Sequence, residues 1–389
     1  MPTTILILTR GYARYRENLF SGVAAALPSS FRVIHSTPHF GEDLWEVNWN
    51  SLLEDGGLVT HITFPKITIL TFIRALFTRI TNKKELSTEL RRPVTLEEVS
   101  PDIVLIQEYS FPMLKALLYC FLRGIPCIVC SDLGRNSDWR QFSWISRLVH
   151  RNAAFLTSAV IAHTNAAKTP LSALGRPICF IPHSVNVSSF SYSHDAPRNE
   201  PVRVLMVAQY IPRKGHDLLA SAVRLLVDRG VRDFQILLVG TQDPAWLESI
   251  IEKENLAVYM HLTGVLKGES LFDEFKRADI FVLTSRFDTF AVAVHEAAAF
   301  GLPLLISKYA EASALLVSEG INGYVIDPFD SVTLAAYLEE LIAQPELRHS
   351  MGQQSRMIGE SLCASKLGAE LAQWLVDFHQ DFSHEHHRS

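Results

Sequence analysis

The sequence predicts an α/β protein with two doubly wound domains, each a parallel sheet covered by helices. Short apolar runs alternate with helical segments along most of the chain, the pattern of parallel strands joined by crossover helices. The chain of 389 residues is longer than one hydrophobic core normally organises. The alternation stops near residues 191–201, where turn-forming residues take over, and then begins again.

In the first half, apolar runs predict buried parallel strands. The first run, "TTILILT", ends before Arg10 and Gly11 and leads into a loop, after which "RENLFSGVAAAL" predicts a helix. The segment "FPMLKALLYCFLRG" predicts a helix between two strands, and Gly124 is the residue expected to end it. Further strands are expected in "PDIVLIQE", "IPCIVCSD", "SAVIAHT" and "ICFIPHSV".

These patterns divide the chain into four segments. Residues 1–190 are expected to form a first Rossmann-like domain, residues 191–201 a linker, and residues 202–365 a second such domain. Residues 366–389 are expected to form a helix with one apolar face that docks on the first domain, followed by a disordered tail. Strands of the second domain are expected in "VRVLMVAQ", "FQILLVG", "VYMHLTG", "ADIFVLTS", "PLLIS" and "YVIDP".

The composition is that of a globular protein with a large core. Hydrophobic residues make up 48% and charged residues 20%, and the net charge of −5 gives no indication of nucleic-acid binding. No apolar run reaches the length of a membrane span, and the five scattered cysteines suit a reducing compartment. We therefore expect a cytoplasmic protein.

Common cofactor and metal motifs are missing from the sequence. Neither domain opens with G-x-G-x-x-G, because the first offers "TRGYARY" and the second "AQYIPRKG", which disfavours a dehydrogenase. The segment "HEAAAF" has Ala299 where the zincin motif has its second histidine. There is no D-x-D triplet. We expect no bound metal and no cofactor.

A candidate phosphate site follows the first strand of the second domain. In "QYIPRKGHDLL", Lys214 and Gly215 stand where a helix is expected to begin. Backbone amides at a helix N terminus, joined by a lysine, can bind a phosphate. The alternative is a surface lysine beside a glycine that starts a helix.

Two carboxylates lie eight positions apart in "SRFDTFAVAVHEAAAFGLP", residues 285–303. Asp288 lies at or just before a helix expected from Phe290 to Phe300, so it can be an N-cap. Glu296 lies inside that helix among apolar residues, where an ionised carboxylate is costly without a partner. It can pair with a basic side chain, or it can accept two hydroxyl hydrogen bonds from a ribose.

Several motifs of the second half, taken in order, resemble the retaining glycosyltransferases of family 4. They are Lys-Gly after the strand end, "LTGVL", "ADIFVLTSRFDTFAVAVHEAAAFGLPLLIS" and "EGINGYVIDPFD", over about residues 201–345. The first half resembles the family more weakly, in "PDIVLIQE", "GIPCIVCSD" and "IPHSVN". The resemblance implies the GT-B fold, with two Rossmann-like domains facing a central cleft, an N-terminal domain for the acceptor and a C-terminal domain for a nucleotide-sugar donor.

The resemblance also implies roles for individual residues. The E-x7-E pair of the family appears as Asp288, which would contact the transferred sugar, and Glu296, which would bind the ribose hydroxyls. Lys214 would neutralise the diphosphate, and Asp132 stands where the family has a histidine that helps orient the reactants. The remaining donor-binding positions are the backbone amides of Phe290, Ala291 and Val292, the base-reading loop at Val265 and Leu266, and Gly11 in the first domain.

This sequence departs from the family pattern at the leaving group. The usual arginine five residues before the lysine is Gln209, and Arg213 is the nearby candidate to replace it. The family's E-G-F-G is D-T-F-A here, so Thr289 and Ala291 replace glycines. These departures bear on the sugar and on the chemistry more than on the fold.

The implied activity is transfer of a sugar from a UDP- or GDP-linked donor to an acceptor hydroxyl of a glycan, a polysaccharide or a lipid-linked sugar, with retention and without metal. Lys214 and the helix N terminus near residue 290 would stabilise the departing diphosphate. Two alternatives stay open: a binding protein of the same fold that has lost catalysis, and a nucleotide-sugar epimerase of that fold. Gln209 and Asp132 are the features that favour the binding protein.

A basic amphipathic segment in the first half suggests a membrane contact. Residues 64–80 place five large apolar side chains on one helical face, and basic residues flank that face up to residue 84. Such a helix can lie on the anionic inner face of a membrane and bring the enzyme to a lipid-linked acceptor. The alternative is a helix that covers the first sheet.

Overall fold

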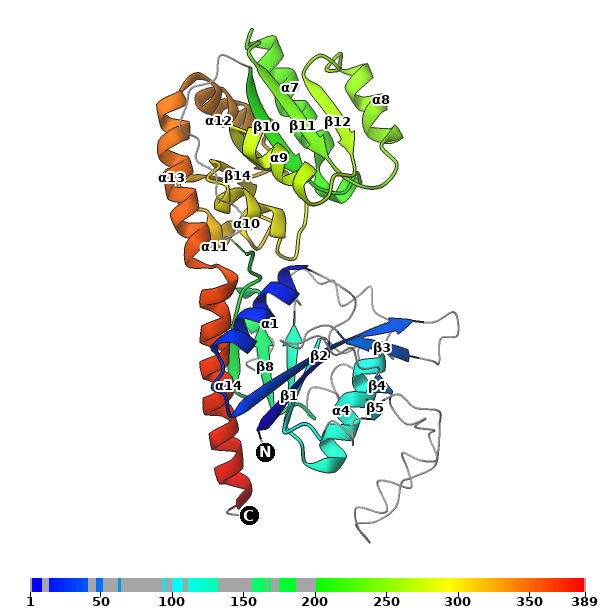
Figure 1. The fold of residues 1–389 in the computed structure, drawn as a ribbon. Coiled ribbons are helices and arrows are strands. Elements are labelled where there is room, and N and C mark those ends of the chain that lie inside the picture. Colours follow the sequence, from blue (N-terminus) through cyan, green and yellow to red (C-terminus); the bar gives the residue numbers. More distant parts are fainter. Residues whose placement is uncertain are drawn as a thin grey trace. The chain divides into compact units, whose positions relative to one another are not determined.

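The chain divides into two compact units, described here one at a time. A computed structural model describes residues 2–8, 14–40, 47–51, 62–63, 94–95, 100–107, 111–131, 156–165, 167–168, 175–186 and 201–387. Unit 1 comprises Met1–Pro182 and Leu367–Ser389, and unit 2 comprises His183–Lys366. Figure 1 shows a sheet and helices in each unit.

Unit 1 is built on a seven-stranded sheet in the order β3-β2-β1-β6-β7-β8-β9. All neighbours are parallel except β3, which runs antiparallel to β2 at one edge. A two-stranded parallel sheet joins β4 and β5. The strands are β1 (Thr3–Leu8), β2 (Phe31–Phe40), β3 (Val47–Ser51), β4 (Ile62–Thr63), β5 (Val94–Thr95), β6 (Ile103–Gln107), β7 (Cys127–Ser131), β8 (Ala159–Ala162) and β9 (Ile178–Phe180).

Helices α1 (Arg14–Ala26), α4 (Phe111–Arg123) and α14 (Ala364–His387) complete unit 1. The apolar side of α4 packs on the sheet through Ala116, Leu117 and Cys120. Gly124 ends α4 with a φ of +69°, as predicted.

The final helix belongs to unit 1 from Leu367 on. Its apolar face is buried at Leu371 and Leu375. A Cβ at Gly368 would lie 2.5 Å from the carbonyl carbon of Gly22 in α1, so glycine is what permits the two helices to approach this closely. The helix extends to His387, into the segment expected to be a disordered tail.

Unit 2 is built on a six-stranded parallel sheet in the order β12-β11-β10-β13-β14-β15. The chain therefore proceeds from β10 toward one edge and then resumes with β13 on the other side of β10. Ligands of such sheets bind at the carboxyl ends of the strands where the order reverses. The strands are β10 (Val202–Val207), β11 (Phe234–Val239), β12 (Met260–Gly264), β13 (Ile280–Leu283), β14 (Leu304–Ser307) and β15 (Gly323–Ile326).

The helices of unit 2 bury their apolar faces against this sheet in one continuous core. Buried strand residues such as Val204, Leu205 and Phe281 contribute to that core. The helices are the 3-10 turn η3 (Pro212–Lys214), α7 (His216–Asp228), α8 (Ala245–Lys253), α9 (Glu269–Arg277), α10 (Val292–Ala299), α11 (Ser313–Leu316), α12 (Ser331–Ala343) and α13 (Pro345–Ser361).

Some described elements were not expected from the sequence, namely β2, β3, β4, β5, η3, α11 and α13. Residues 183–186 also belong to unit 2, although the sequence analysis assigned them to the first domain. The proposed linker at 191–201 lies, apart from Pro201, outside the described residues, as does the basic segment at 64–84. Among the described residues no helix is long and apolar enough to cross a membrane.

Candidate active site

Two loops of unit 2 meet at the carboxyl edge of the sheet. One leads from β10 to α7 and contains Lys214, and the other leads from β13 to α10 and contains Asp288. Because β10 and β13 are neighbours, the loops that follow them lie side by side at the point where the strand order reverses.

The turn that carries Lys214 depends on its flanking residues. Pro212 opens the 3-10 turn with a fixed φ, and Gly215 follows Lys214 with a φ of +73° and begins α7. A Cβ at Gly215 would lie 2.0 Å from the backbone oxygen of Thr284, at the end of β13. The Thr284 hydroxyl in turn donates to the Gly215 carbonyl at 2.7 Å. Lys214 is therefore held directly against the loop that follows β13.

Lys214 and Asp288 form an ion pair in which Nζ of Lys214 donates to Oδ2 of Asp288. Only 13% of the lysine side chain and 8% of the aspartate side chain are exposed. The Asp288 backbone amide donates to the Tyr309 carbonyl at 3.1 Å, which ties the pair to the segment after β14. The sequence assigned these two residues to different parts of a ligand, and the structure brings them into direct contact.

The interpretation of Asp288 as an N-cap is wrong. The residue that caps α10 is Ala291, with φ 69° and ψ 71° and no side-chain hydrogen bond. Asp288 lies three residues before it, in the loop. The family glycine at position 291 is replaced by alanine without loss of the positive φ, at a cost of about 1–2 kcal/mol for an L-residue.

The N terminus of α10 is placed by packing on both sides. Phe290 is buried, and its ring packs edge-on against His183 with centroids 5.1 Å apart. A helix N terminus leaves backbone amides of its first turn without an intrahelical partner, although here the Val294 amide donates to the Ala291 carbonyl at 2.9 Å. The first-turn amides give this end of α10 a partial positive charge, which favours a bound anion.

Glu296 is half-buried on α10, while His295 beside it is fully buried. The His295 ring lies with Nε2 2.9 Å from the Gly359 carbonyl of α13 and Nδ1 3.3 Å from the His183 carbonyl. Burial lowers the pKa of His295, so it is neutral at pH 7 and donates to one carbonyl at a time. These contacts fix the rotation of α10 about its axis and therefore the position of Glu296 on that helix.

Further hydrogen bonds cross between the two loops. The backbone amide of Arg286 donates to the Arg213 carbonyl at 2.9 Å, and the Arg213 guanidinium donates to the Phe287 carbonyl at 2.8 Å. Arg213, the candidate to replace the family arginine, is thus exposed but engaged with this loop. Gln209 is exposed at the end of β10.

The predicted base-reading loop follows β12. Val265 is 51% exposed, and Leu266 packs partly against the core. Tyr210 anchors this loop, because its hydroxyl accepts from the Gly264 amide at 3.1 Å and donates to the Leu238 carbonyl at 2.7 Å. The sequence analysis did not single out Tyr210, although its place directly after Gln209 at a strand end was the available signal.

The structure thus brings ten of the predicted site residues to the carboxyl edge of the second sheet. They are Gln209, Arg213, Lys214, Val265, Leu266, Asp288, Phe290, Ala291, Val292 and Glu296. The two first-domain residues, Gly11 and Asp132, lie outside the described residues.

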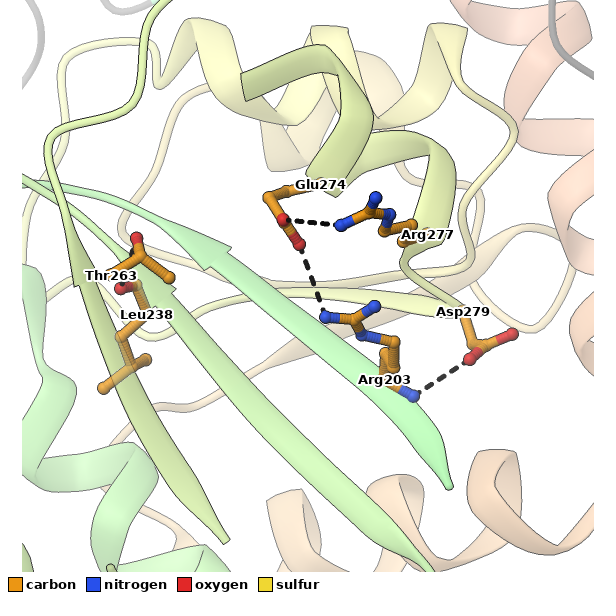
Figure 2. A network of polar contacts seen from close by, with 6 residues as sticks. All are labelled: Arg203, Leu238, Thr263, Glu274, Arg277 and Asp279. Atoms are coloured by element: carbon orange, nitrogen blue, oxygen red, sulfur yellow. Dashed lines mark hydrogen bonds and ion pairs between the residues drawn. The ribbon is translucent and has the colours of Figure 1, made fainter. Parts of the chain in front are cut away.

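The amino edge of the same sheet carries a separate polar network (Figure 2). Arg203 of β10 pairs with Glu274 at 3.5 Å, Glu274 also pairs with Arg277 at 3.5 Å, and the Arg203 amide donates to Asp279 at 2.9 Å. Because it lies at the opposite end of the strands from Lys214, this network supplies control variants that alter charge without altering the candidate site.

Known proteins match part of the sequence and the fold of this chain. Residues 193–357 match the family described as glycosyl transferases group 1. The fold matches sucrose-phosphate synthase from Thermosynechococcus elongatus with a TM-score of 0.69 and 17% identity, over 97% of this chain and 100% of that one. It also matches Alr3699/HepE of Anabaena, solved with UDP and glucose, with a TM-score of 0.68 and 15% identity, over 96% and 100%. The fold is GT-B.

Two curated proteins share part of their sequence with this chain. The glycogen synthase of Mycobacterium tuberculosis (strain CDC 1551 / Oshkosh) is 26% identical over 264 residues, 66% of this chain and 60% of that enzyme. The GDP-mannose-dependent alpha-mannosyltransferase of Corynebacterium glutamicum is 29% identical over 182 residues, 43% of this chain and 42% of that enzyme. The matches span less than two thirds of the length of these two relatives.

Proposed function

We propose that this GT-B protein is a glycosyltransferase that moves a sugar from a UDP- or GDP-linked donor to an acceptor hydroxyl, with retention of configuration and without a metal ion. The observation that carries the proposal is the Lys214–Asp288 pair beside the N terminus of α10, at the point where the strand order reverses. A cation and a helix N terminus together suit a diphosphate. The match of residues 193–357 to group 1 glycosyltransferases supports the same conclusion.

In this proposal the chemistry requires stabilisation of a leaving group. The bond between the anomeric carbon and the diphosphate oxygen breaks as the acceptor oxygen bonds to that carbon, and the acceptor proton passes to the departing diphosphate. Lys214 and the α10 amides stabilise the negative charge that develops there. Removing one such donor from a transition state typically costs about 100-fold or more in turnover.

The other residues are assigned to orientation. Asp288 contacts the transferred sugar, and Glu296 accepts hydrogen bonds from the ribose hydroxyls. Backbone groups around Val265 and Leu266 contact the base. From the family resemblance alone, Asp132 is assigned to orient the acceptor hydroxyl and Gly11 to contact the diphosphate.

A donor screen tests the proposal. The full-length protein is incubated with UDP- and GDP-sugars and an acceptor extract, and released nucleoside diphosphate is measured for the wild type, Lys214→Ala and the control Glu274→Gln. We expect acceptor-dependent release that Lys214→Ala reduces about 100-fold and Glu274→Gln leaves unchanged. Proton NMR of the first product reports its anomeric configuration. Equal release by the wild type and Lys214→Ala would refute the assignment.

A further inference from the structure

Arg286 lies two residues before Asp288, and its side chain bonds across to the segment between β10 and α7. Its guanidinium donates to both carboxylate oxygens of Asp217, at 2.7 and 2.6 Å. It also donates to the Pro212 carbonyl at 2.6 Å. Its backbone amide donates to the Arg213 carbonyl. One residue of the β13–α10 loop therefore contacts three positions of the β10–α7 segment.

These contacts enclose the turn that carries Lys214. Pro212 is the first residue of that turn, and Asp217 lies in the first turn of α7, so Arg286 bonds to the chain on both sides of Lys214. A bidentate arginine–carboxylate pair fixes both distance and orientation, which a lysine at the same place does not. About a third of each partner is exposed, 31% for Arg286 and 29% for Asp217, so the pair is partly shielded from water.

Charge and aromatic contacts keep the guanidinium in place. Although burial acts to raise it, the hydrogen bonds from Arg286 hold the pKa of Asp217 below its ordinary value. The Phe329 ring lies 5.8 Å from the guanidinium carbon of Arg286, within the range of a cation–π contact. Asp217 is thus ionised at neutral pH, so its ion pair with Arg286 is intact under the conditions in which a transferase would work.

We infer that Arg286, through Asp217 and the Pro212 carbonyl, is a positioning residue that holds Lys214 against Asp288 for donor binding and transfer. It is not a catalytic residue, since its guanidinium is occupied by the protein itself. The inference rests on the proposed function for its effect on turnover, but its effect on the position of Lys214 holds without that function.

The first test needs no substrate. Amine-labelling rates of the full-length protein, read by mass spectrometry, compare Lys214 with Lys276 on α9 as an internal reference. We expect Arg286→Ala and Asp217→Asn each to raise the relative rate at Lys214 about tenfold, and Arg286→Lys to give a smaller rise. Glu274→Gln, which breaks a pair at the opposite edge, should leave the rate unchanged. Unchanged labelling of Lys214 in folded Arg286→Ala or Asp217→Asn would overturn the inference.

The second test asks whether Arg286 acts through Lys214. In the wild-type background Arg286→Ala should lower nucleotide-sugar turnover about tenfold. In the Lys214→Ala background it should change turnover about twofold or less, because the group that it positions is gone. Equal effects in both backgrounds would overturn the inference. If labelling responds as expected but no nucleotide-sugar is turned over, the positioning stands and the proposed function falls.

Discussion

Lys214 and Asp288 come from loops that follow different strands, and they bind each other through a nearly buried ion pair. In the proposed function Lys214 neutralises the diphosphate of the donor. Asp288 therefore holds the cation in the place where a diphosphate is expected, and it adds a negative charge to that place. A donor that binds Lys214 has to share it with Asp288 or displace it.

The first prediction concerns that competition. Asp288→Asn removes the charge that competes for Lys214 and keeps the shape of the side chain. We expect it to bind free UDP or GDP about three- to tenfold more tightly than the wild type, which corresponds to about 0.7–1.4 kcal/mol of relieved competition, and to transfer sugar poorly. Calorimetry beside a turnover assay measures both. Nucleotide affinity equal to or below that of the wild type would refute the competition.

The second prediction separates Glu296 from Asp288. If Glu296 binds the ribose, Glu296→Ala should lower the affinity for UDP or GDP by about one to two decades. This is the scale of a hydrogen bond to a charged group. The same substitution should change the affinity for the 2′,3′-dideoxy nucleotide by about twofold or less, because the hydroxyl partners are absent from that ligand. An equal loss with both ligands would make Glu296 a structural residue.

The third prediction concerns Gly215. Gly215→Ala places a Cβ 2.0 Å from the Thr284 carbonyl oxygen and adds the strain of a positive φ, so it should displace Lys214 and lower both the melting temperature and turnover. Gly230→Ala is the matched control, because Gly230 also has a positive φ, +89°, but no atom within 4 Å of its Cβ position. The control variant should lose only about 1–2 kcal/mol of folding free energy and should retain turnover. Equal melting temperatures for the two variants would contradict the close approach at Gly215.

The fourth prediction concerns acid stability. His216 is fully buried at the start of α7, and burial, with Lys214 nearby and partly offset by Asp217, lowers its pKa to about 4 from an ordinary value of 6.5. The unfolded chain binds the proton first, so this histidine favours unfolding increasingly as the pH falls from 6.5 to 4. The free energy of unfolding therefore falls by about 3 kcal/mol over this pH range. Urea unfolding from pH 7 to pH 4 should show it in the wild type and not in His216→Leu. Equal pH dependence in both proteins would show that His216 does not titrate in this range.

Much of the fold could be predicted because the strands of unit 2 are mostly apolar runs, such as "IFVL" in β13, and most are followed by glycine or polar residues. The β2 strand was missed because "FRVIHSTPHF" mixes polar residues and a proline into its run, so its periodicity is weak. The α13 helix was missed because "PELRHSMGQQSRMIGES" has few apolar residues and is placed by tertiary contacts, among them the close approach of Gly359 to Ala299.

The candidate site was predicted as a set of residues but not as a set of contacts. Lys214, Asp288 and Glu296 could be found because their spacing from strand ends is local information. The Lys214–Asp288 pair and the Arg286–Asp217 pair span 74 and 69 residues, so only the order of strands in the sheet brings them together. The patterns K-G-x-D at 214–217 and S-R-x-D at 285–288 contain all four charged residues, yet neither pattern states which charges meet.

The central claim is that Lys214 and the α10 N terminus, rather than a divalent cation, stabilise the departing diphosphate. The most direct measurement is turnover of the wild type and Lys214→Ala with the best nucleotide-sugar donor, in excess EDTA and again with added Mg²⁺ or Mn²⁺. The account predicts that wild-type turnover survives EDTA and that Lys214→Ala is about 100-fold slower in both conditions. Wild-type turnover that EDTA abolishes and a divalent cation restores would contradict it.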